Sequence, residues 1–131
     1  MKLFALALDA LLGSPLQEPV ELPEELLHEG VVLRRGRWIP VLGGVLGRMR
    51  GPAAAVTLGR HIILHPSARP TRRLLAHELE HVRQWRADPL FPLRYTLESL
   101  RRGYHHNRYE AEARAAETRP HPTPTQPGRP V

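Results

Sequence analysis

The clearest hydrophobic periodicity in the chain lies between residues 71 and 87. When successive residues are turned by about 100°, as in an α-helix, three apolar side chains share one face and three polar ones lie nearly opposite. These are Leu75, Leu79 and Val82 on the first face, and His77, His81 and Gln84 on the second. Thr71 is a residue type that caps helix starts, and Asp88-Pro89 would stop the helix. We therefore expect a helix over 71–87 that is covered on two sides.

Two short apolar runs come immediately before this helix. Residues 56–58 and 62–64 bracket Gly59-Arg60, the pattern of two antiparallel strands around a two-residue turn. Pro66 ends the second run. The sequence therefore predicts a β-hairpin that leads into the helix.

A further hairpin is predicted upstream, where residues 31–33 and 38–42 flank a turn at 34–37. Pro40 has no N–H to donate to a ladder, so its segment can be an edge strand at most. Glycines at 43, 44, 47 and 51 are expected to break up the chain after it. The proline-punctuated residues 13–23 are expected to be a connection, and residues 24–29 a short helical turn.

The apolar opening, residues 1–8, resembles an export signal in its hydrophobicity. Asp9 interrupts it, however, and no small-x-small cleavage site follows. We expect an ordinary amphipathic helix that ends near Gly13. No apolar run approaches the roughly 20 residues that cross a bilayer, so we expect no membrane span and a cytoplasmic location.

After the 71–87 helix, a second helix is expected over 93–102, with a break at Gly103. A third should start near Asn107 and carry small or aromatic residues at helical spacing, namely Tyr109, Ala113 and Ala116. From residue 119 onward five of thirteen residues are proline. We expect one domain over 1–118 and a disordered tail over 119–131.

Composition narrows the chemistry that this domain can perform. The chain has 131 residues and no cysteine, so any metal must be held by its eight histidines and thirteen acidic residues. Its net charge of +6 is carried by arginine apart from Lys2. Because these arginines are scattered in short clusters, composition argues against a dedicated nucleic-acid partner.

The sequence His77-Glu78-Leu79-Glu80-His81 lies on the expected 71–87 helix. Histidines four residues apart project one turn apart on one face, so both imidazoles can reach one ion. Glu78 would then stand beside the open coordination position, where a carboxylate can accept a proton from water. Zinc accepts imidazole and carboxylate in tetrahedral geometry and is the expected metal. A solvated histidine pair without a metal is the alternative.

A catalytic zinc needs a third protein ligand, and residues 103–113 are the next stretch that offers donors. Four side chains there can serve: His105, His106, Glu110 and Glu112. Glu110 also follows Asn107 by three residues, the spacing of a helix-capping box, which is a competing structural explanation for it. Spacing alone leaves the third ligand open.

With these residues in place, the chain resembles the gluzincin metallopeptidases, in which an H-E-x-x-H helix precedes a helix that carries a glutamate ligand in an E-x-x-A pattern. Residues 110–113 fit that pattern. The resemblance covers about 53–117 and implies a minimal zincin-like α+β core, with Glu110 as the third zinc ligand. Where thermolysin-like relatives place an aspartate that supports the first histidine, this chain has Arg114. Support for His77 must then come from elsewhere.

The resemblance implies a zinc metallopeptidase that cleaves peptide bonds, with Glu78 as general base. Tyr104 is the expected second donor to the oxyanion, with His105 and His106 as alternatives. A peptide or protein substrate is expected along the outer strand of the 56–64 pair. His61 and His65 lie near that strand and could face the cleft, although exposed positions explain them equally well. An inactive zincin-like binding module is the main alternative function, and a basic nucleic-acid-binding protein is the second.

Overall fold

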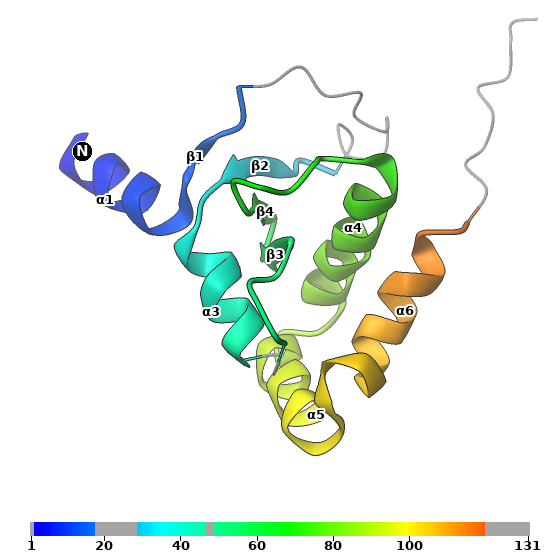
Figure 1. The fold of residues 1–131 in the computed structure, drawn as a ribbon. Helices are drawn as coiled ribbons and strands as arrows, with labels where there is room; N and C mark the ends of the chain where they lie inside the picture. Colours follow the sequence, from blue (N-terminus) through cyan, green and yellow to red (C-terminus); the bar gives the residue numbers. More distant parts are fainter. Residues whose placement is uncertain (1, 18–28, 47–48, 120–131) are drawn as a thin grey trace, which may run out of the picture.

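The computed structural model describes residues 2–17, 29–46 and 49–119 (Figure 1). Its architecture is α+β, as predicted, with a small four-stranded sheet and helices packed around it. Within these ranges, none of the helices combines the length and apolar character that crossing a bilayer requires. Most of the expected helical turn at 24–29, and the tail from residue 120, lie outside the described residues.

The sheet has the strand order β1-β2-β4-β3. Its strands are β1 (Ser14–Pro15), β2 (Val32–Arg35), β3 (Ala55–Leu58) and β4 (His61–Leu64). Strands β2 and β4 run parallel, whereas the other neighbouring pairs are antiparallel. The predicted hairpin is confirmed as β3 and β4, with Gly59 at a φ of 62° in the turn. Because β3 lies at one end of this order, one of its long sides is an edge of the sheet.

The predicted long helix is confirmed as α4 (Arg72–Ala87), and Thr71 caps it by accepting from the backbone N–H of Leu74. Leu75, Leu79 and Val82 are fully buried against Ile62 and Leu64 of the sheet. The opposite face of α4 is also buried, as expected for a helix covered on both sides. Its polar side chains, His77, His81 and Gln84, are at most 8% exposed.

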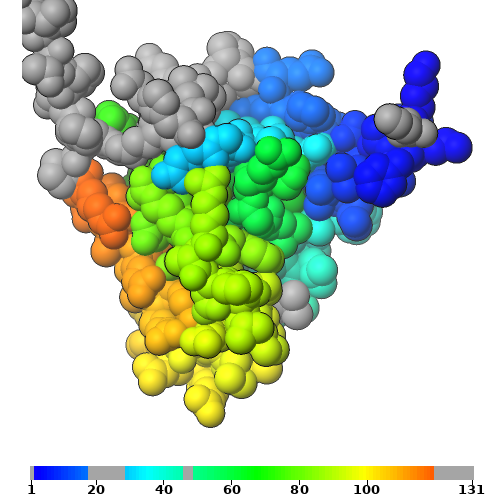
Figure 2. Space-filling view, turned by 180° about the vertical axis from the view of Figure 1, so that it is seen from behind, coloured from blue at the N-terminus to red at the C-terminus, as the bar shows by residue number. Residues whose placement is uncertain are grey.

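Two further helices cover that polar face. α5 (Phe91–His106) and α6 (Arg108–Ala116) follow α4 in the chain, and α6 lies alongside α4 in both views (Figures 1 and 2). The expected break at Gly103 is a kink within α5, where φ is 74°. Asn107 caps α6, and the predicted stripe of Tyr109, Ala113 and Ala116 is buried.

The N-terminal helix is confirmed as α1 (Lys2–Leu12). Its Asp9 forms an ion pair of 2.8 Å with Arg34 of β2. That arginine also donates to the carbonyl of Gly13, so it ties the end of α1 to the sheet.

The predicted strand at 38–42 is wrong, because this segment belongs to α3 (Trp38–Leu46). Pro40 is compatible with a helix here, since the first four N–H groups of a helix have no partner within it. The predicted break at Gly43-Gly44 is also wrong. Both glycines lie inside α3, where a Cβ on Gly44 would come 2.2 Å from the carbonyl oxygen of Gly51. The absence of side chains at Gly43 and Gly44 therefore allows α3 to pack closely against Val56 and residues 51–53.

Candidate metal centre

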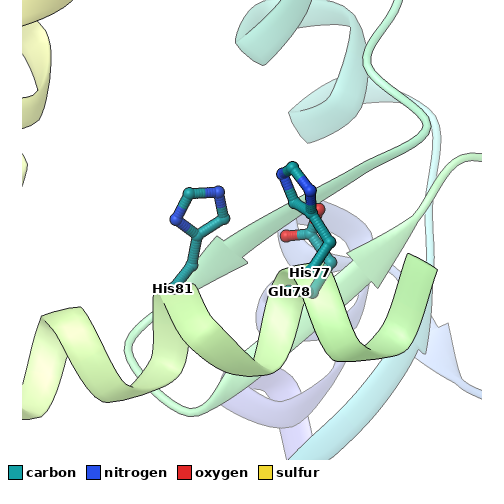
Figure 3. A group of neighbouring side chains, drawn as sticks. All are labelled: His77, Glu78 and His81. Atoms are coloured by element: carbon teal, nitrogen blue, oxygen red, sulfur yellow. The ribbon is translucent and has the colours of Figure 1, made fainter. Parts of the chain in front are cut away.

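His77 and His81 project from the same side of α4, with the carboxylate of Glu78 beside His77 (Figure 3). The two imidazole centroids are 5.1 Å apart, with the rings inclined by 74°. One donor atom from each of the three residues lies within 4.8 Å of the others, and all three residues are buried. This group is able to hold a metal ion.

Glu110 of α6 brings a second carboxylate to the two histidines. Its Oε2 lies 2.8 Å from His77 Nε2, and its Oε1 lies 3.0 Å from His81 Nε2. Glu110 is 3% exposed. Among the expected donors after α4, it is the one that the structure brings against both imidazoles.

The capping explanation for Glu110 is not what the structure shows. Asn107 caps α6 by accepting from the N–H of Tyr109, while its own N–H donates to the carbonyl of Tyr104. The side-chain amide of Asn107 also donates to Ser99 of α5. With the start of α6 fixed in this way, the Glu110 carboxylate points to the histidines.

Sequence reasoning missed Tyr95 of α5. Its hydroxyl donates to Glu110 Oε1 at 2.7 Å, and its ring meets His81 edge-on. The available signal was the spacing of four residues that joins Phe91, Tyr95 and Ser99 on one face of a helix. That face is turned to the interior of the protein, whereas Leu93, Leu97 and Leu100 of the same helix are exposed.

Glu78 is held by the edge strand of the sheet. Thr57 of β3 donates its hydroxyl to Glu78 Oε2 at 2.8 Å. Burial raises the pKa of Glu78, although the neighbouring histidines and the Thr57 hydrogen bond oppose that rise. This buried carboxylate lies beside two imidazoles, where it can exchange a proton with a neighbouring group.

The pKa of Glu110 is shifted in the opposite direction to that of Glu78. Burial alone would raise the pKa of Glu110, but the contacts with His77 and His81 hold it well below the usual range. For a histidine the effect of burial has the opposite sign: burial alone would lower the pKa of His81, but Glu110 and Glu78 raise it to about 9. The pKa of His77 is raised for the same reason. Glu110 is therefore ionised, and in the absence of a metal it pairs with protonated imidazole.

A cavity of about 350 Å³ opens over these groups. Residues 53–58, which include the edge strand β3, form one wall, and α5 contributes Phe91, Tyr95 and Ser99. His77, Glu78, His81 and Glu110 also line it. A molecule in this cavity would touch both the buried ionisable groups and residues of β3.

Tyr104 also lines the cavity. Burial, followed by the negative charge of Glu110, raises the pKa of Tyr104, so its hydroxyl stays protonated and can donate.

The remaining expected candidates lie elsewhere. His105 and His106 are exposed at the end of α5, and the carboxylate of Glu112 accepts from the Gln84 amide. His61 contacts Arg34, His65 contacts Ser67, and neither histidine lines the cavity. Arg114 donates to the carbonyl of His105.

Part of the chain matches a known family. Residues 48–89 match the model of the eCIS core domain, a stretch that includes β3, β4 and α4 and covers less than half of the chain. No curated protein and no solved structure matches the chain. His77, Glu78 and His81 thus lie in the part of the chain that is similar to the eCIS core domain, whereas Glu110 lies beyond it.

Proposed function

We propose that this chain is a zinc-dependent hydrolase of peptide bonds, built as a minimal single-domain zincin. The observation that carries the proposal is the position of Glu110, whose two carboxylate oxygens lie 2.8 and 3.0 Å from the Nε2 atoms of His77 and His81. Two imidazoles from α4 and one carboxylate from α6 therefore lie in contact at a buried position beside a cavity.

The donor set fits zinc. Imidazole nitrogen and carboxylate oxygen are both donors that zinc accepts in proteins. Two imidazoles and one carboxylate are a common catalytic zinc set, which leaves the fourth position for water. Zinc bound there would polarise a carbonyl and lower the pKa of water toward about 7.

Glu78 is the general base in this proposal. Since Glu78 Oε2 accepts from Thr57, we assign the transferred proton to Oε1. Burial, which raises its pKa, makes this carboxylate a better proton acceptor than a solvated glutamate. Glu78 would then deliver the proton to the leaving nitrogen.

Tyr104 and β3 orient the substrate. An extended peptide can add to the open side of β3 through main-chain hydrogen bonds, and this strand lines the cavity. Tyr104 lines the same cavity with a protonated hydroxyl, so it can donate to the oxygen of the scissile carbonyl. Tyr95 already donates to Glu110 and is assigned to holding that ligand.

The test compares purified wild type with Glu78→Gln and Glu110→Ala in metal content and in cleavage of a quenched fluorescent peptide library. We expect about one zinc per chain in wild type and in Glu78→Gln, with cleavage only by wild type, and strongly reduced zinc in Glu110→Ala. Zinc binding without cleavage by wild type would favour an inactive binding module. Full zinc retention by Glu110→Ala would overturn the assigned ligand set.

A further inference from the structure

We infer that Glu117 and Gln84 are positioning residues that hold His77 and His81 with the proton on Nδ1 and the lone pair of Nε2 directed at the metal. This inference rests on the proposed function, because it names the groups that prepare the two histidines as ligands. Gln84 was expected on the same helix face as the two histidines, but neither Gln84 nor Glu117 was predicted to contact them.

Glu117 contacts the side of His77 that faces away from Glu110. Its Oε1 lies 3.3 Å from His77 Nδ1, whereas Glu110 lies 2.8 Å from His77 Nε2. Glu117 is the C-cap of α6 and has helical backbone angles. It follows Glu110 by seven residues, two helical turns, so both carboxylates point to the same side. Arg73 contacts the other oxygen of Glu117 at 3.3 Å. The carboxylate is therefore held from two directions.

Gln84 fixes His81 through a chain of hydrogen bonds. Its side-chain Nε2 donates to the carbonyl of Tyr109 and to Glu112 Oε2, at 3.1 and 2.9 Å. These two acceptors decide which way the amide points, because only the nitrogen of an amide can donate. Gln84 Oε1 is thereby turned to His81 Nδ1, 2.7 Å away.

The chemistry of these partners decides where each histidine carries its proton. An ionised carboxylate and an amide oxygen can only accept, so an imidazole that hydrogen-bonds to either of them through Nδ1 carries its proton there. A neutral imidazole has a single N–H, which leaves Nε2 unprotonated and able to bind a metal. Partners of this kind orient histidine ligands, and their loss typically costs about 10- to 100-fold in metal affinity. In this chain Glu117 supplies the support for His77 that Arg114 cannot, since a guanidinium does not accept.

The experiment measures zinc affinity by chelator competition in Glu117→Ala, Glu117→Gln and Gln84→Ala. The zinc-loaded proteins are also compared by long-range ¹H–¹⁵N NMR of the histidine side chains. Glu98→Ala is the matched control, because the side chains of Glu98 and Glu117 are 17% and 18% exposed and each contacts an arginine. Thermal unfolding of each variant reports on folding independently of the metal.

We expect zinc affinity about 10- to 100-fold lower in Glu117→Ala and in Gln84→Ala, and unchanged in Glu98→Ala. Glu117→Gln, whose amide oxygen still accepts, should restore most of the affinity. The NMR signal of the protected Nδ1–H should disappear for His77 alone in Glu117→Ala and for His81 alone in Gln84→Ala. A variant that failed to fold would lose the Nδ1–H signals of both histidines and not of one alone.

Two results would overturn the inference while zinc binding by the wild type, and with it the proposed function, stands. The first is unchanged affinity with both Nδ1–H signals intact. The second is complete loss of zinc in Glu117→Ala and Glu117→Gln alike, as in Glu110→Ala, which would make Glu117 a ligand. If the wild type binds no zinc, the proposed function fails and the inference fails with it.

Discussion

The hydroxyl of Thr57 in β3 donates to the carboxylate of Glu78 in α4, with 2.8 Å between Thr57 Oγ1 and Glu78 Oε2. The same hydroxyl lies 3.2 Å from the backbone carbonyl of Glu78. Both residues are buried. The strand expected to receive substrate is therefore connected directly to the proposed base, so a change in one should alter the other.

Thr57→Val should shift the pH dependence of cleavage. The Thr57 hydrogen bond lowers the pKa of Glu78 against the effect of burial, so its removal should raise that pKa. Because Glu78 must be ionised to accept a proton, the acid limb of the kcat/KM profile should move to higher pH. An unmoved acid limb would contradict the role of Thr57. Urea unfolding should show a loss of about 1–3 kcal/mol, since a buried acceptor loses its donor.

Zinc affinity should increase with pH between about pH 7 and 9. The pKa of His81 in the metal-free protein is raised to about 9, so this imidazole is protonated at pH 7, and the pKa of His77 is raised as well. Zinc requires the neutral ring and must displace these protons. Each displaced proton contributes about tenfold in affinity per pH unit until the ring titrates. Calorimetry in buffers of different ionisation enthalpy should detect proton release at pH 7, and an absence of release would contradict the pairing of Glu110 with protonated histidine.

Tyr95→Phe should weaken zinc binding without abolishing it. The Tyr95 hydroxyl donates to Glu110 Oε1, and hydrogen bonds to charged groups contribute about 1.5–3 kcal/mol. Its loss leaves the Glu110 carboxylate less firmly placed between the histidines, so we expect affinity to fall about tenfold. Tyr109→Phe is a suitable control, because the Tyr109 hydroxyl contacts Arg108 at the surface and the ring packs against Phe91. Equal zinc affinity in Tyr95→Phe and wild type would exclude Tyr95 from the site.

The sequence predicted the structure best for α4, the helix that is buried on two opposite faces. The periodicity of 71–87 correctly predicted α4 as a helix covered on two sides, because apolar and polar residues both repeat at helical spacing. Glu110 was one of four possible third donors, since spacing along the chain cannot say which side chain of a later helix turns inward.

The residues and the helix that were not predicted from the sequence were missed for physical reasons. In α5, Leu93, Leu97 and Leu100 are exposed, whereas Tyr95 points to Glu110. The expectation that the most apolar face of a helix is the buried one therefore identifies the wrong face of α5. Glu117 and Gln84 act through contacts between helices, which depend on how α4 and α6 pack rather than on local pattern. At 38–42, apolar and β-branched residues favoured a strand, whereas the glycines that follow allow α3 to pack closely on residues 51–53.

Gly44→Ala should destabilise the protein, whereas Gly51→Ala should not. A Cβ on Gly44 would come 2.2 Å from the carbonyl oxygen of Gly51, and backbone cannot move aside as the end of a flexible side chain can. A Cβ on Gly51 would meet nothing within 4 Å. We expect Gly44→Ala to lose about 1–3 kcal/mol in urea unfolding, which is the usual cost of forcing extra atoms into a packed site. Gly51→Ala should be neutral or slightly stabilising, because alanine restricts the unfolded chain. Equal stability of the two variants would contradict the close packing of α3 against the segment that leads into β3, and with it the position of one wall of the cavity.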